Sequence, residues 1–125
     1  MTHTKEEKKA YFSNLREQWK KSKELAQADQ TAKALYNETG GKYSYTSFYF
    51  TLLQMRTQQL DGIPYIDAKT FKGWREAGFS VKRGEKSLLS GITWIDAHAD
   101  QEDAEKLLFP KVYHLFNRKQ VETLS

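Results

Sequence analysis

A basic and aromatic stretch in the middle of the chain contains the side chains best suited to chemistry with a polyanion. Residues 69–86 carry six cations against two carboxylates, and they end in the turn sequence Val81-Lys82-Arg83-Gly84-Glu85-Lys86. A turn glycine lets the backbone approach a phosphate closely, and the flanking cations supply the charge. The alternative is an ordinary exposed turn whose charges favour solubility. The candidate phosphate contacts in this stretch are Lys72, Arg75, Lys82, Arg83 and Lys86.

The densest run of aromatic residues lies upstream of the basic stretch, at residues 43–49. An extended conformation of Tyr43-Ser44-Tyr45 would project both tyrosine rings to one face, where they could stack two bases. The alternative places these two rings in the core, and for Phe48 we expect the core. Rings and cations together suit single-stranded nucleic acid, because bases stack on aromatic side chains while phosphates meet Lys and Arg.

The patterns typical of an enzyme or a metalloprotein do not occur in the sequence. The histidines, His3, His98 and His114, are far apart, and none has the HExxH or HxH spacing of metal ligands. GxSxG, P-loop and GxGxxG motifs do not occur either, and cysteine is absent. We therefore expect no catalysis, no cofactor and no metal. The lack of cysteine fits a cytoplasmic protein, and no apolar run is long enough for a membrane span.

Length and composition predict one small domain over residues 1–125. Aromatic residues make up 14% of the chain, which leaves rings for the surface as well as for the core. The net charge is only +4, but it is segregated, because residues 96–106 carry five carboxylates against one cation. Such a pattern creates a directional field, although a solvated surface of mixed charge is the alternative.

Helical periodicity dominates the first half of the chain, and strand periodicity follows it. Apolar residues recur at helical spacing from Phe12 to Ala26, so this helix could pack on the domain, track phosphates or mediate oligomerisation. Downstream, Asp67 is expected to cap a helix that buries Phe71 and Trp74. The expected helices cover residues 5–28, 32–38, about 47–59 and 68–77, and the expected antiparallel strands cover residues 87–95 and 109–116.

This order of elements predicts an α+β fold, in which N-terminal helices pack on a small antiparallel sheet or hairpin. Residues 1–39 would form a helical N-terminal region, and residues 40–125 would form the core. Within that core we expect the basic turn at residues 81–87 and a hairpin over residues 87–117.

Four short motifs follow one another along the chain in an order known from one family. They are Gly41-Lys42-Tyr43-Ser44, Thr70-Phe71-Lys72, Gly78-x-x-Val81-Lys82-Arg83-Gly84-Glu85-Lys86 and Phe116-Asn117-x-x-Gln120-x-Glu122. Over about residues 8–122 the chain resembles the N-terminal domain of the ArdC-type antirestriction proteins, which occur on plasmids, phages and other mobile elements.

The resemblance implies a module that binds single-stranded DNA without sequence specificity. In full-length relatives a zinc metallopeptidase-like domain with an HExxH motif follows, and residues 1–125 contain no such motif, so we expect binding without protease activity. The chain departs from the family pattern at Tyr45 and Ser47, where relatives have Gly-x-Asn. It also departs at Ala68, where a Trp is common, and at Ser87, where a Gly is common.

The expected partner is therefore single-stranded DNA, with no membrane association and an undetermined oligomeric state. Tyr43 and Tyr45 would stack bases, and Asn117 would make a polar contact or cap the end of the hairpin. RNA is a weaker alternative partner, because nothing in the sequence recognises the 2′-hydroxyl. An alternative of a different class is a protein-binding inhibitor of a host defence or replication factor, which would use residues 96–106 and the N-terminal helix.

Overall fold

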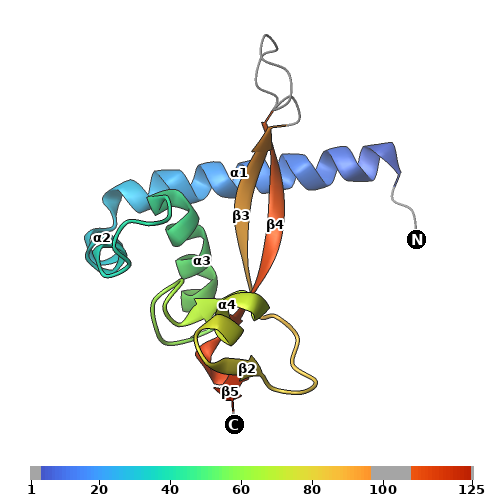
Figure 1. Cartoon of the computed structure of the whole chain (residues 1–125). Helices are drawn as coiled ribbons and strands as arrows, with labels where there is room; N and C mark the ends of the chain where they lie inside the picture. Colours follow the sequence, from blue (N-terminus) through green and yellow to red (C-terminus); the bar gives the residue numbers. More distant parts are fainter. Residues whose placement is uncertain (1–3, 97–107, 125) are drawn as a thin grey trace.

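The computed structural model describes residues 4–96 and 108–124, and it has an α+β fold in which the N-terminal helices pack on small antiparallel sheets (Figure 1). The helices are α1 (Lys5–Ala28), α2 (Gln30–Asn37), α3 (Tyr45–Thr57), α4 (Phe71–Glu76) and the 3-10 helix η1 (Arg118–Gln120). The strands are β1 (Ala68–Lys69), β2 (Phe79–Val81), β3 (Leu89–Asp96), β4 (Leu108–Asn117) and β5 (Val121–Thr123). The predicted fold class is therefore confirmed.

The larger sheet has the strand order β1-β4-β3, and its main part is the antiparallel pair of β3 and β4. Leu89 pairs with Leu115 at one end of this pair, and Trp94 pairs with Pro110 towards the other. The expected hairpin is thus confirmed. A second sheet joins β2 to β5, a pairing that the sequence did not indicate. As a result the basic turn after β2 is not a hairpin turn, because the partner of β2 lies forty residues further along the chain in β5.

Helix α1 lies across the β3–β4 hairpin and packs on it (Figure 1). Thr4 and Glu7 form a reciprocal capping box at its start, which satisfies two of the free amides of the first turn. Phe12 reaches Phe109 with ring centroids 6.3 Å apart, and Trp19 reaches Trp94 at 5.5 Å, both edge to face. Of the roles considered for this helix, packing on the domain is the one observed. In the described part of the chain no helix is long and apolar enough to cross a membrane.

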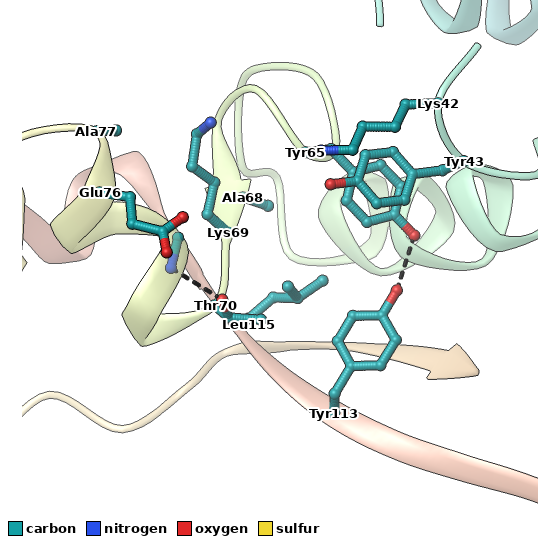
Figure 2. Close-up of a pocket in the computed structure, with 11 residues that line it drawn as sticks. Lys42, Tyr43, Tyr65, Ala68, Lys69, Thr70, Glu76, Ala77, Tyr113 and Leu115 are labelled. Atoms are coloured by element: carbon teal, nitrogen blue, oxygen red, sulfur yellow. Dashed lines mark hydrogen bonds between the residues drawn. The ribbon is translucent and has the colours of Figure 1, made fainter. Parts of the chain in front are cut away.

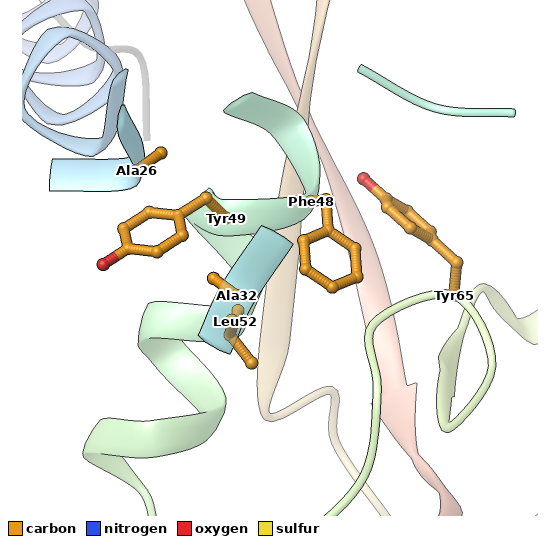
Figure 3. Close-up of a cluster of buried hydrophobic side chains, with 6 residues drawn as sticks. All are labelled: Ala26, Ala32, Phe48, Tyr49, Leu52 and Tyr65. Atoms are coloured by element: carbon orange, nitrogen blue, oxygen red, sulfur yellow. The ribbon is translucent and has the colours of Figure 1, made fainter. Parts of the chain in front are cut away.

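Helix α3 is the centre of the core, as its nearly continuous apolar surface predicts. Phe48, Tyr49 and Leu52 pack against Ala26 of α1 and Ala32 of α2 (Figure 3). On its other side α3 faces the edge of β3, where the Gln54 amide accepts from the Ser90 N–H and donates to the Ser90 carbonyl oxygen, each at 2.9 Å. One side chain thus takes the place of a neighbouring strand there.

Three helix starts differ from the prediction. Helix α2 begins at Gln30 and not at residue 32, because the Asp29 carboxylate accepts a hydrogen bond from the Ala32 N–H and caps the helix. Helix α3 begins at Tyr45, because the Ser44 hydroxyl accepts a hydrogen bond from the Ser47 N–H and caps the helix earlier than expected. Helix α4 begins at Phe71 with Thr70 as its cap, and not at residue 68 with Asp67 as its cap. The backbone of residues 68–69 pairs with β4 instead, which removes those residues from the helix.

Candidate nucleic-acid interface

The basic turn has the geometry that its glycine predicts. The Glu85 N–H donates to the Lys82 carbonyl oxygen at 3.1 Å, and Gly84 has a φ of +85°. A positive φ at the third residue is the requirement of a type II turn, which glycine meets without strain. The side chains of Lys82, Arg83 and Lys86 are exposed. The turn therefore presents three cations to solvent on a defined backbone.

A second segment, residues 116–120, holds the turn in place. The Gln120 amide donates to the Lys86 carbonyl oxygen at 2.6 Å and to the Glu85 carboxylate at 3.2 Å. The Lys82 N–H donates to the Gln120 carbonyl oxygen at 2.8 Å, and the Lys82 ammonium donates to the Lys119 carbonyl oxygen at 3.2 Å. Because Lys82 is engaged in this way, Arg83 and Lys86 are the turn cations with side chains free of partners among the described residues.

Tyr43 forms an exposed stacking platform. Its ring lies flat on the ring of Tyr65, with centroids 3.8 Å apart and planes 14° apart, and 37% of its surface is exposed. Beneath it Tyr65 is buried, and its hydroxyl bonds the Tyr113 hydroxyl at 2.9 Å. Burial raises the pKa of Tyr65 and of Tyr113 above the ordinary value of a tyrosine, which favours the neutral phenol in both.

A cleft of about 390 Å³ opens beside this stack (Figure 2). Tyr43 and Lys42 stand on one side, with the Lys42 ammonium 5.7 Å from the centre of the Tyr43 ring. Lys69 and Glu76 stand on the other side (Figure 2). An aromatic face with cations near it is what a base and its flanking phosphates require. The sequence did not single out Lys69 and Tyr65, because residues 65 and 69 join residue 43 only through the fold. Lys42 was also not selected, although its position next to Tyr43 in the chain could have indicated it.

Tyr45 does not share the exposed face with Tyr43, so that part of the prediction is wrong. As the first residue of α3 it turns its ring towards Tyr36, Phe48 and Tyr49, and its hydroxyl donates to the Ala26 carbonyl oxygen at 2.7 Å. Burial raises the pKa of Tyr45, and the nearby Asp29 carboxylate raises it further. Tyr45 is therefore part of the packing between α1, α2 and α3.

The same junction contains an ionic contact at Asp29. Its carboxylate accepts from the Arg56 guanidinium at 2.7 Å, from the Tyr49 hydroxyl at 3.0 Å and from the Ala32 N–H at 2.9 Å. The Arg56 hydrogen bond, with help from the Ala32 amide, lowers the pKa of Asp29 to about 2. Asp29 thus caps α2 and fixes it to α3.

Asn117 serves as a cap and is not an exposed polar contact. Only 1% of its surface is exposed, its side-chain oxygen accepts from the Lys119 N–H at 3.1 Å, and its own N–H donates to Gln120 at 3.0 Å. Of the two roles proposed from the sequence, the capping role is observed. A direct contact between this side chain and nucleic acid is ruled out by its burial.

Lys72 and Arg75 lie on the exposed side of α4 and make only local contacts. Lys72 lies 3.9 Å from Glu76, and the Arg75 guanidinium lies 6.0 Å from the centre of the Phe71 ring. Phe71 is 50% exposed, so the expectation that it packs in the core is wrong. Phe71 is the first residue of α4, which starts three residues later than expected, and Trp74 alone fills the buried side of this short helix. Phe71 thus becomes a second exposed ring beside a cation.

Arg118 makes structural contacts within the fold. Its guanidinium lies 5.1 Å from the Trp74 ring and 5.7 Å from the Phe79 ring, and it donates to the Asp67 carboxylate at 2.6 Å. Asp67 is therefore occupied by an ion pair instead of capping a helix. Of the acidic segment at residues 96–106, only Asp96 is described, at the end of β3, and the remainder lies outside the described residues.

No protein-family model, curated protein or solved structure matches this chain. The resemblance to the N-terminal domain of ArdC-type proteins thus rests on the four sequence motifs. Two of these motifs, at residues 78–86 and 116–122, are hydrogen-bonded to each other in the fold.

Proposed function

We propose that this protein binds single-stranded DNA without strong sequence preference, and that it carries out no catalysis. In this proposal Tyr43 stacks a base, and Arg83 and Lys86 contact phosphates. Lys42 and Lys69 extend the basic surface beside the ring, and Lys72, Arg75 and Lys82 add to the positive field. The role is that implied by the resemblance to ArdC-type proteins of mobile elements.

The observation that carries the proposal is the Tyr43–Tyr65 stack with Lys42 beside it. Tyr43 is supported on one face by Tyr65 and is 37% exposed, so it can extend the stack by one more ring at little entropic cost. Paired bases in a duplex do not offer a free face, because they are stacked on their neighbours. The platform therefore favours an unpaired strand.

The cations support the same conclusion. Arg83 and Lys86 are exposed, and no described residue forms an ion pair with them, so their charge remains available to phosphates. A contact with a phosphate releases counterions and makes binding dependent on salt. Among the described residues no three His, Cys, Asp or Glu side chains come together as a metal site.

Photocrosslinking tests where the strand binds. A single-stranded 20-mer that contains 5-iodo-deoxyuridine is irradiated with the protein, and the adducts are located by mass spectrometry. The proposal predicts adducts at Tyr43, with Phe71 as a secondary position. Adducts confined to exposed Tyr11 of α1, or no adducts, would contradict it. Capture of a host protein by a chain that ignores DNA and RNA would favour the inhibitor alternative.

A further inference from the structure

The cleft beside Tyr43 has a lining suited to one nucleobase. Its volume of about 390 Å³ lies within the range of small-molecule pockets. Ala68 and Leu115 give it an apolar floor, and Tyr43 gives it an aromatic wall (Figure 2). A flat ring that enters would meet this aromatic and apolar lining, while Lys69 and Glu76 supply polar groups on the far side of the cleft.

The aromatic wall is fixed in advance by unusual backbone and packing. Tyr65 has a φ of 69°, a left-handed conformation that is costly for a residue with a side chain. Its ring stacks on the Tyr43 ring, and its hydroxyl is hydrogen-bonded to the Tyr113 hydroxyl. Tyr113 in turn lies over Gly91, where a Cβ atom would come within 2.2 Å of the tyrosine ring. A strained residue held by several contacts is typical of a binding site.

The edge of the cleft formed by α4 presents an acceptor. Glu76 lines the cleft, across from Tyr43, and its nearest ionic partner among the described residues is Lys72 at 3.9 Å (Figure 2). Both side chains of that pair are mostly exposed, at 87% and 69%, so the pair is weak. The Glu76 carboxylate is therefore able to accept hydrogen bonds from a bound group.

We infer that this cleft takes one unstacked base of the bound strand, and that Glu76 makes guanine preferred over thymine at that position. The inference rests on the proposed function. A carboxylate accepts hydrogen bonds but cannot donate them. Guanine offers N1–H and N2–H side by side on its Watson–Crick edge. Thymine offers one N–H between two carbonyl oxygens, which the carboxylate repels.

The test compares a labelled dT 12-mer with the same strand carrying one central dG, by fluorescence anisotropy. The dG strand should bind roughly fivefold more tightly than the dT strand. This value is at the lower end of the discrimination expected for a contact with two donors, because Glu76 is largely exposed. Glu76→Gln should remove this preference, so that the variant binds the dG and dT strands with equal affinity. Glu122→Gln removes the same charge from exposed β5, away from the cleft, and should keep the preference.

Base analogues identify the contacted edge. Inosine lacks the N2 amine and should bind with intermediate affinity, whereas 7-deazaguanine keeps the Watson–Crick edge and should bind like guanine. Equal binding of the dT and dG strands, or a preference that survives Glu76→Gln, would overturn the cleft inference while the proposed function stood. No binding of either strand would overturn both.

Discussion

The side-chain amide of Gln120 donates a hydrogen bond to the backbone carbonyl oxygen of Lys86 across 2.6 Å. Gln120 is buried, and it also bonds Glu85, so the shape of the basic turn depends on a residue 34 positions away. The turn and residues 116–120 therefore act as one structural unit. Their co-occurrence in the sequence has a physical reason, since the second motif positions the cations of the first.

Replacing Gln120 with Glu should loosen this unit. The variant keeps an acceptor for the Asn117 N–H but loses the donor to Lys86 and places a second carboxylate beside Glu85. We expect a loss of about 1–3 kcal/mol in the free energy of unfolding, the cost of unpaired buried polar groups. Urea denaturation measures this loss, and hydrogen exchange should show faster exchange at the Glu85 amide. Gln18→Glu, on exposed α1, is the control, and a Gln120 variant that behaves like it would contradict the account.

Removing the Tyr43 ring should weaken DNA binding without unfolding the protein. Tyr43→Ala deletes the exposed platform, and we expect the free energy of binding to a single strand to fall by about 1–3 kcal/mol. Tyr43→Phe keeps the ring and should retain most of the affinity. Tyr11→Ala removes a ring that is 52% exposed on α1 and serves as the matched control. Equal losses at Tyr11 and Tyr43 in an anisotropy titration would show that the platform has no special role.

The turn cations should determine the salt dependence of binding. On single strands each neutralised phosphate contributes about −0.7 to the slope of log K against log salt concentration. The double variant Arg83→Ala, Lys86→Ala should therefore make the slope shallower by about 1.4. The control Lys20→Ala, Lys23→Ala removes the same charge from the exposed side of α1. If the control changes the slope as much as the turn variant does, then the turn is not the phosphate site.

Acid stability should report on Asp29. Its folded pKa of about 2 lies below the ordinary value of 3.8, so its stabilisation is present above pH 3.8 and is lost as the pH falls towards 2. Asp29→Asn keeps a helix cap but loses the charge facing Arg56, and should cost about 1–2 kcal/mol at neutral pH. Denaturation at pH 7 and near pH 2 measures the difference, which should shrink at the lower pH. A difference that is constant with pH would mean that Arg56 does not set this pKa. Glu24→Gln, exposed on α1, should show neither effect.

The sequence predicted the elements that local patterns determine. Helix α1 has the predicted bounds, because its apolar spacing and the break at Asp29 are local features. The β3–β4 pair was predicted for the same reason, since both strands are long enough to show their pattern. Strands β1 and β5 are two and three residues long and exist only through pairing with distant segments, so no local pattern revealed them.

The candidate site was predicted in part, for a related reason. The turn cations follow from a local motif, and they are exposed as expected. The sequence could not show that the two tyrosines differ in exposure. The position of the helix cap at Ser44 decides that Tyr45 packs inward while Tyr43 stays outside. Tyr65, which supports the platform, lies 22 positions from Tyr43 and comes beside it only in the folded chain.

The central claim is that the protein binds unpaired nucleic acid through stacking and phosphate contacts. Fluorescence anisotropy with a labelled DNA 20-mer, as a single strand and as a duplex, at about 50 and 200 mM salt tests this most directly. The account predicts tighter binding of the single strand and a clear loss of affinity at the higher salt concentration. Equal binding of the duplex, or no binding of the single strand at low salt, would contradict it.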